Sequence, residues 1–376
     1  MAPLSRQIGQ VMRSDRDSPT RPPSRRARGA RSLRLGAVLV LGGAVALAGC
    51  LPPPPPPPLY TPSRSLYAPD FPDPAIAAAA GHYYAFSTNS IYGTLDWPIV
   101  PTATATALST WTRGVPTDAL ARRPAWQVQT PLLEKNWAPA VHQFGATWVL
   151  YFAAPAYTGE QCIGVATAAV PQGPYQPVDA GPIVCDYGAG GSIDPSVVVD
   201  TSNQAWLLWK TDGNCCQLPT PVKSQPLAPD GLTVASGTTP HTILNQDQAW
   251  EDGSNGGQQP WKRLVEGPAM VQQGGVYWLF YSANWWDSSN YAVGYARCTS
   301  PAGPCVKPRN GPLVGSGPFG AGPGGPDTFT DTGGQLWLVY HAWDPAAVGT
   351  AANGRRTLRL NRLGVAGAGP ILGAGP

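Results

Sequence analysis

The chain has 376 residues with 25 basic and 22 acidic side chains, a formal net charge of +3. Residues 1–49 hold nine arginines and two aspartates, so the rest carries 16 basic against 20 acidic residues, a net charge of about −4. Residues 50–376 have no basic stripe, which argues against nucleic acid as a partner.

The first 49 residues have the composition of a signal peptide rather than of a folded domain. Arginines precede an apolar run over 35–48 that is too short to span a bilayer comfortably. The run ends in Leu47-Ala48-Gly49-Cys50, which resembles a bacterial lipobox and implies cleavage before Cys50 and lipid modification of its thiol. A plain secretory signal cut nearby is the alternative. We expect an extracellular, cell-surface lipoprotein that meets the membrane only through Cys50.

Seven prolines occupy positions 52–58, directly after the lipobox. Such a run forms a stiff polyproline II rod of roughly 20 Å. We therefore expect a lipidated cysteine and spacer over 50–66, followed by one catalytic domain over 67–376, since the composition shows no later break.

The segment after the spacer is rich in Gly, Pro, Trp and Tyr and poor in charge. It lacks long apolar periodicity at i, i+3, i+4 and i+7, which an amphipathic helix would show. Short β-branched and aromatic runs instead recur between Gly, Pro, Asn and Asp clusters. This profile predicts an all-β domain.

One template occurs five times: a small or acidic residue, a proline, an apolar strand, a turn and an aromatic-rich strand. The template prolines lie 65, 56, 73 and 58 residues apart, at Pro74, Pro139, Pro195, Pro268 and Pro326. This spacing is typical of one propeller blade with its loops. The sequence therefore predicts a five-bladed β-propeller of four-stranded antiparallel blades rather than a sandwich.

Three repeats carry an acid beside the template proline, namely Asp73, Asp194 and Glu266. A single Asp-Pro pair is usually turn punctuation, but these acids share a phase in the repeat, with Glu266 one residue further from its proline. First strands of propeller blades line the central channel, so the three side chains should converge at one end of it. Carboxylates brought together in this way have pKa values pushed apart, which suits acid–base catalysis.

Five motifs are similar, in order and spacing, to the blade motifs of glycoside hydrolase family 43, over about residues 67–365. They are Phe71-Pro72-Asp73-Pro74, Trp137-Ala138-Pro139, Ser192-Ile193-Asp194-Pro195-Ser196, Val265-Glu266-Gly267-Pro268 and Tyr340-His341-Ala342-Trp343. The resemblance implies a five-bladed propeller that acts on arabinans, arabinofuranosides or xylosides. It also implies that Asp73 is the general base, Glu266 the general acid and Asp194 the residue that tunes the pKa of the acid. Asp70 is the nearest rival for the base.

The resemblance suggests further site residues. It implies that His341 helps to hold a hydrated calcium or another ion on the propeller axis, although no cofactor is needed for the chemistry; a core histidine bonded to backbone is the alternative. Trp137 is the expected stacking partner of a sugar ring, and Trp285 and Trp286 could form a second platform. An arginine of Gly354-Arg355-Arg356 either closes the fifth blade or reaches the site.

Six cysteines remain after Cys50, which fits an oxidising compartment. We favour two disulfides, Cys162–Cys185 and Cys298–Cys305. The adjacent pair Cys215 and Cys216 is then left as free thiols, a strained vicinal disulfide or members of another pairing. A zinc site is disfavoured because no second CxxC or histidine cluster accompanies these residues.

We expect an inverting glycoside hydrolase that acts on plant-cell-wall pentose polysaccharide, above all on α-L-arabinofuranosyl linkages of arabinan. The stretch Asp212-Gly213-Asn214 and the cysteine pattern favour arabinan over the alternative of a β-xylosidase. A catalytically silent sugar-binding propeller is the second alternative, and a WD40-like scaffold is disfavoured because its Gly-His and Trp-Asp signatures are missing. The expected partner is an oligo- or polysaccharide, and the expected state is a monomer.

Overall fold

The computed structural model describes residues 58–89, 98–129, 135–367 and 369–376. The predicted signal peptide, Cys50 and nearly all of the proline run therefore lie outside the described residues. Within the described ranges, none of the helices has the length and apolar character needed to cross a bilayer.

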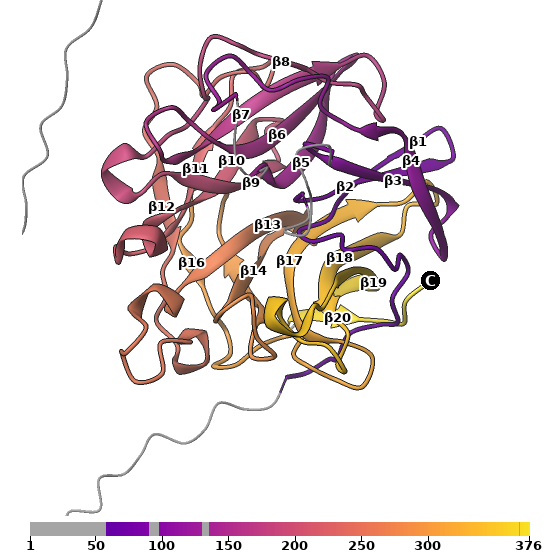
Figure 1. Ribbon diagram of the computed structural model, residues 1–376, viewed down its shortest axis with the longest axis vertical. Coiled ribbons are helices and arrows are strands. Elements are labelled where there is room, and N and C mark those ends of the chain that lie inside the picture. Colours follow the sequence, from indigo (N-terminus) through magenta and orange to yellow (C-terminus); the bar gives the residue numbers. More distant parts are fainter. Residues whose placement is uncertain (1–57, 90–97, 130–134, 368) are drawn as a thin grey trace, which may run out of the picture. The chain divides into compact units, whose positions relative to one another are not determined.

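Five four-stranded antiparallel sheets form a ring, which confirms the predicted five-bladed propeller (Figure 1). Each blade takes four strands consecutive in the chain. Blade 1 contains β1 (Ala75–Ala79), β2 (His82–Phe86), β3 (Pro101–Ala107) and β4 (Thr110–Asp118). Blade 2 contains β5 (Trp137–Phe144), β6 (Thr147–Pro155), β7 (Gln161–Ala168) and β8 (Gln176–Pro177).

The remaining three blades follow the same order. Blade 3 contains β9 (Ser192–Val199), β10 (Ala205–Thr211), β11 (Val222–Pro226) and β12 (His241–Leu244). Blade 4 contains β13 (Val265–Gln273), β14 (Val276–Ala283), β15 (Ala292–Cys298) and β16 (Cys305–Val306). Blade 5 contains β17 (Ala321–Thr330), β18 (Leu336–Trp343), β19 (Arg356–Ala366) and β20 (Gly369–Leu372).

The only helical elements in the described ranges are short 3₁₀ turns in the connections. They are η1 (Tyr187–Ala189), η2 (Gly213–Cys216), η3 (Ala249–Glu251), η4 (Pro260–Lys262) and η5 (Thr350–Ala352).

The first strands of the blades surround the axis in the order β1, β5, β9, β13 and β17, each beside its two neighbours. The residue before each template proline has a left-handed backbone, with φ between 44° and 58°, at Asp73, Ala138, Asp194, Gly267 and Gly325. A left-handed residue interrupts regular pairing, and register shifts accompany it in blades 2 to 5. The repeat seen in the sequence is thus a repeated kink of the innermost strand, where the strand enters the axial channel.

Most of these kinks are tied to the preceding blade by a hydrogen bond. In blades 1, 2, 4 and 5, the amide N–H of the left-handed residue donates to a side chain of that blade. The pairs are Asp73 N to His341 Nδ1 (3.0 Å), Ala138 N to Thr88 Oγ1 (2.7 Å), Gly267 N to Asp194 Oδ2 (2.8 Å) and Gly325 N to Ser282 Oγ (2.8 Å). These bonds satisfy buried amides that the strand ladder leaves free at the kink.

The apolar core consists of five clusters, each between two adjacent blades. Strand residues alternate between the two faces of a blade, so each blade contributes to the cluster on either side. The aromatic residues of the second strands are the largest members, for example Trp209, Tyr281 and Tyr340. The ring is therefore held by burial between neighbouring blades, with about 1.5–3 kcal/mol from each large side chain that is fully buried.

A segment before blade 1 closes the ring on blade 5. Its backbone pairs with β19, through Leu66 N to Leu358 O (3.0 Å) and Phe71 N to Arg356 O (2.7 Å). This is the half of β19 that β20 does not cover, since β20 pairs only with residues 363–366. Phe71 is fully buried there, so this N-terminal segment holds the last blade to the first.

Candidate active site

A cavity of about 360 Å³ lies at the kinked ends of the inner strands, and all five blades contribute to its lining. Asp73, Asp194 and Glu266 all line it, as do Trp137, Trp285 and Trp286. The three acids and three tryptophans singled out from the sequence therefore meet in one place. The roles of the acids in catalysis stay predictions.

The two aspartates and the glutamate enter the cavity differently. Asp73 and Asp194 are themselves the left-handed residues before the template proline. In blade 4 this position is Gly267, and Glu266 precedes it, as Trp137 precedes Ala138 in blade 2. The offset of Glu266 by one residue thus places it at the same repeat position as Trp137.

Glu266 is buried, and both of its oxygens accept a hydrogen bond. Lys210 Nζ donates to Oε2 at 2.9 Å, and Tyr291 OH donates to Oε1 at 2.8 Å. Burial alone would lower the pKa of Lys210, but adjacent carboxyls, with Glu266 the strongest, outweigh it and raise that pKa. Burial, reinforced by the charge of Glu266, raises the pKa of Tyr291 well above its ordinary value. Both groups therefore stay protonated donors to Glu266.

Asp194 is the carboxyl in this cluster with the strongest resolved shift. Burial raises the pKa of Asp194 to about 8, and the negative charges of Glu266 and Asp73 act in the same direction. Lys210 and the hydrogen bond from Gly267 N, 2.8 Å from Oδ2, oppose the shift. Near neutral pH, Asp194 consequently holds a proton within the cluster.

Asp73 is held by groups of blades 1 and 5. Thr88 Oγ1 donates to Asp73 Oδ2 at 2.6 Å, and His341 Nδ1 accepts the backbone N–H of Asp73 at 3.0 Å. Thr88 also accepts the amide of Ala138, so one hydroxyl joins blades 1 and 2 at the cavity wall. Asp70, the rival base, is engaged with blade 5 instead, since its Oδ1 accepts the backbone N–H of Arg356 at 2.7 Å.

Arg356 reaches the cavity with its side chain, while its backbone pairs with the segment that closes the ring on blade 5, so both alternatives for this arginine stretch apply. Its guanidinium lies 4.8 Å from the ring centroid of Trp286 and 5.5 Å from that of Trp343. It also lines the cavity beside Trp286. A cation stacked on an indole and facing a cavity is a donor for sugar hydroxyls.

His341 is fully buried below Asp73, and its ring nitrogens have different surroundings. Nδ1 accepts the amide N–H of Asp73, which places the proton of the neutral imidazole on Nε2. Burial lowers the pKa of His341 well below its ordinary value, so the ring stays neutral. A protonated Nε2 has no lone pair for a cation, and no group of three or more His, Cys, Asp or Glu suited to a metal occurs among the described residues. These residues do not fit direct ligation of the implied ion, and an ion on the axis stays a prediction.

The described residues contain three disulfides. Cys162–Cys185 and Cys298–Cys305 are the two pairs favoured from the sequence. Cys215 and Cys216 form a vicinal disulfide, which settles the alternative that the sequence left open.

Several cavity residues were missed in the sequence. Lys210 gave a usable signal, because a lysine inside the apolar strand of 205–211 must find a buried anion. Asp327, directly after the template proline of blade 5, lines the cavity, and burial raises its pKa to about 7. Burial likewise raises the pKa of Asp212 to about 6. Thr88 and Tyr291 gave no signal, since both lie outside the repeat.

Comparison with known proteins identifies a family of glycosyl hydrolases. Residues 65–366 match the model of Glycosyl hydrolases family 43. The chain is 27% identical over 257 residues to a β-D-galactofuranosidase, xynD, of Aspergillus niger. That match covers 66% of this chain and 65% of the relative, so this chain spans about two thirds of the length of the relative.

Two solved structures show the same fold. An endo-1,4-beta-xylanase from Bacteroides thetaiotaomicron superposes with a TM-score of 0.65 at 24% identity, covering 83% of this chain and 97% of that one. An α-L-arabinanase of Cellvibrio cellulosa in complex with arabinohexaose superposes with a TM-score of 0.61 at 21% identity, covering 81% and 95%.

Proposed function

Because the chain belongs to glycosyl hydrolases family 43, we propose that it is an inverting glycosidase with Asp73 as general base and Glu266 as general acid. The observation that supports these roles is that carboxyls from blades 1, 3 and 4 line one cavity. An inverting enzyme needs its acid and base on opposite sides of the sugar, about 6.5–9.5 Å apart, so that a water fits between. Residues on different blades can meet this requirement, whereas neighbours on one strand cannot.

In the proposed reaction, Asp73 takes a proton from a water whose oxygen attacks the anomeric carbon. In the reactive complex the proton that Asp194 holds at rest lies on Glu266, which gives it to the glycosidic oxygen as the bond to the leaving sugar breaks. Thr88 orients the carboxylate of Asp73, and His341 holds the backbone amide of the same residue. Lys210 and Tyr291 stabilise the negative charge that Glu266 acquires. Asp194 holds a proton beside this pair and limits the negative charge of the cluster.

The test is substitution of the two proposed groups. We expect Glu266→Gln and Asp73→Asn each to lower kcat about 10³-fold, in line with the size of general acid–base effects, without changing the circular dichroism spectrum. Glu266→Gln should recover activity on aryl glycosides with good leaving groups, because these need no protonation. Asp230→Asn, at an exposed turn, is the matched control and should keep full activity. Full activity of either Glu266→Gln or Asp73→Asn on a natural oligosaccharide would refute the assignment.

For the substrate we propose α-L-arabinofuranosyl linkages, the class implied by the blade motifs. A β-D-galactofuranosyl linkage is the second candidate, favoured by the relative from Aspergillus niger. The sugar is a five-membered ring in both candidate linkages, so both require the innermost part of the cavity to fit a furanose. A β-xylosidase would instead accept a six-membered ring.

An assay panel separates these candidates. We would incubate residues 58–376 with 4-nitrophenyl α-L-arabinofuranoside, β-D-galactofuranoside and β-D-xylopyranoside, and with linear 1,5-arabinan. Proton NMR of the first product identifies its anomeric configuration, and inversion is expected. Hydrolysis of only the galactofuranoside or only the xyloside would replace the arabinan proposal. Saturable binding of oligosaccharide without any turnover would support a silent binding propeller.

We also propose that the enzyme is anchored outside the cell through Cys50. The lipobox-like stretch that ends at Cys50 supports this location. Cys50→Ala should move the full chain from the detergent phase to the aqueous phase in Triton X-114 partitioning. If both forms partition into the aqueous phase, the lipid anchor is excluded and the plain secretory signal is the remaining interpretation.

A further inference from the structure

We propose that the Cys215–Cys216 disulfide and the indole of Trp261 form the binding surface for the sugar on the leaving-group side of the scissile bond. This inference rests on the proposed glycosidase function and adds the surface that selects the leaving sugar. Neither the disulfide nor Trp261 belongs to a blade motif.

The disulfide lies at the mouth of the cavity. Cys215 lines the cavity, and both cysteines are exposed on η2. Once joined, the two sulfur atoms carry no thiol proton and no charge. They present a compact, polarisable and apolar surface, which suits the C–H face of a sugar better than a polar loop would.

The turn that carries the disulfide is held firmly by backbone contacts. Asp212 N donates to Gly191 O at 2.9 Å, and Leu218 N donates to Gly213 O at 2.8 Å. Gly190 is left-handed, with φ at 85°, and a Cβ on it would lie 3.0 Å from Cys215 Sγ. The neighbouring loop therefore packs directly under the sulfur and fixes its position, as a preorganised binding surface requires.

The disulfide lies on the side of the proposed acid. Asn214, next to Cys215, accepts a hydrogen bond from Lys210 Nζ at 2.7 Å, and the same ammonium donates to Glu266. The contacts of Asp73 come instead from Thr88 and His341, on blades 1 and 5. Because the acid protonates the oxygen of the leaving sugar, that sugar must lie on the side of Glu266.

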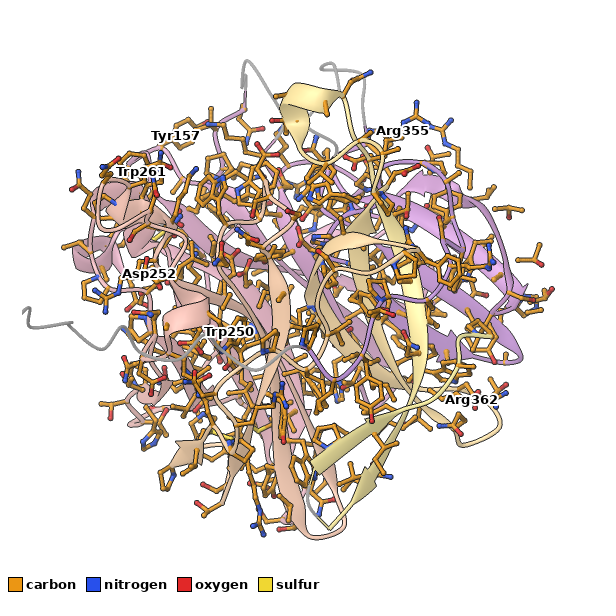
Figure 2. All side chains as sticks on the ribbon, turned by 90° about the horizontal axis from the view of Figure 1, so that it is seen from below. Tyr157, Trp250, Asp252, Trp261, Arg355 and Arg362 are labelled. Atoms are coloured by element: carbon orange, nitrogen blue, oxygen red, sulfur yellow. A yellow bond between two sulfur atoms is a disulfide. The ribbon has the colours of Figure 1, made fainter. Side chains whose placement is uncertain are left out.

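Trp261 extends this surface outward. It belongs to η4, which lies beside η2, and 38% of its surface is exposed. The next residue, Lys262, places its ammonium 5.2 Å from the ring centroid of Trp285, which lines the cavity. Figure 2 shows Trp261 at the same end of the propeller as Arg355, whose neighbour Arg356 lines the cavity, while Arg362 lies at the other end. An exposed indole at this end is placed to stack on a sugar that leaves the cavity.

The test compares two substrates with one glycone and different leaving groups. For the arabinose series these are arabinotriose, with a sugar as leaving group, and methyl α-L-arabinofuranoside, which lacks it. We measure the ratio of kcat/KM for arabinotriose to kcat/KM for the methyl glycoside. Cys215→Ala/Cys216→Ala and Trp261→Ala should each lower this ratio about tenfold, the effect of losing one stacking contact, with the larger share in KM. Trp261→Phe should retain most of the ratio, because an aromatic face remains.

The matched control is Cys298→Ala/Cys305→Ala, which removes a disulfide between β15 and β16 in the outer part of blade 4. It should leave the ratio unchanged. If the double variant at 215 and 216 fails to fold, as judged by circular dichroism, the pair Trp261→Ala and Trp261→Phe decides.

The outcomes separate this inference from the function on which it rests. If the assay panel identifies another glycone, the same ratio is measured with the corresponding pair of substrates. Turnover with an unchanged ratio in the variants overturns the inference and leaves the proposed function intact. Absence of turnover of any glycoside by the unmodified protein overturns both.

Discussion

At the scale of single residues, the cavity joins opposite charges in a buried cluster. Glu266 is paired with Lys210, and Asp194 next to them has a pKa raised to about 8. Lys210 has no exposed side-chain surface, so its charge is tolerable only while a carboxylate faces it. The cluster therefore combines a fixed cation, a carboxylate and a proton held on a second carboxyl.

The first prediction concerns this cation. Lys210→Met keeps the length of the side chain but removes the cation that opposes the raised pKa of Asp194. Because Asp194 then holds its proton to higher pH beside the proposed acid, we expect the alkaline limb of the kcat/KM profile to move to higher pH, with a lower kcat. An unchanged pH profile measured on an oligosaccharide, whose leaving sugar must be protonated, would show that Lys210 does not act on this cluster.

The second prediction concerns the pH dependence of stability. Asp194 has a pKa of about 8 in the folded chain, against an ordinary value near 4, so the folded state binds more protons between these values. Its contribution to stability is fully present below pH 4 and is lost as pH rises to 8. Asp194→Asn should therefore flatten the decline of Tm between pH 5 and 8, as measured by thermal unfolding.

The control for this measurement is Asp200→Asn. Hydrogen bonds from Ser202, Trp206 and Gln204 outweigh burial and lower the pKa of Asp200, so its contribution is present at neutral pH and lost as pH falls. Asp200→Asn should therefore change the dependence of Tm on pH only below about pH 4 and leave the slope between pH 5 and 8 as it is in the unmodified protein. A slope between pH 5 and 8 that Asp194→Asn leaves unchanged, or that Asp200→Asn changes equally, would contradict the assigned shift of Asp194.

At the scale of the strands, the left-handed residue before each template proline determines which side chains of the inner strand face the cavity. Glycine adopts this backbone without strain, whereas Asp73, Ala138 and Asp194 adopt it at a cost of roughly 1–2 kcal/mol each. At the two aspartates the strained position projects a carboxyl into the cavity. At Ala138 it brings no functional group.

The third prediction uses these positions. Ala138→Gly should stabilise the protein by about 0.5–1 kcal/mol in urea unfolding, because relief of strain exceeds the added freedom of the unfolded chain. Gly325→Ala should destabilise it strongly, by about 3 kcal/mol or more, since a Cβ would lie 2.5 Å from Asp73 Oδ1. Gly267→Ala is the matched control: its Cβ would meet no atom closer than 3.4 Å, so only backbone strain is added. Equal losses at both glycines would contradict this account.

At the scale of the whole molecule, blades hold one another through the cores between them. Blade 5 meets blade 1 through a cluster that includes Phe71, and the segment before blade 1 pairs with β19. The ring is thereby closed by residues far apart in the chain. This closure also fixes His341 of blade 5 against Asp73 of blade 1, so it positions the proposed base.

The fourth prediction tests this closure. Phe71 is 1% exposed and contacts Tyr67 edge to face at 5.3 Å, so Phe71→Ala should lower the free energy of unfolding by about 3–5 kcal/mol. Leu59→Ala, at a side chain that is 52% exposed, should change it by less than about 0.5 kcal/mol. A small loss at Phe71 in denaturant titration would show that the ring closes without this segment.

Much of the fold and part of the site were predictable from the order of residues along the chain. The five prolines and the acids beside them occupy equivalent positions of the repeat. Because the first strand of every blade lies at the propeller axis, equivalent positions of these strands come together there. Local sequence therefore indicated the propeller, and with it the shared location of Asp73, Asp194 and Glu266. The short β-branched and aromatic runs likewise indicated the strands whose apolar residues fill the cores between blades.

The partners of these acids could be known only from the assembled ring. Lys210 meets Glu266 across 56 positions of the chain, and His341 meets Asp73 across 268. Such contacts depend on how neighbouring blades are rotated and on where connections such as η2 and η4 lie, and no local pattern encodes either. Burial depends on the same packing, so the shift of Asp194 and the vicinal disulfide at the cavity mouth were decided by tertiary structure alone.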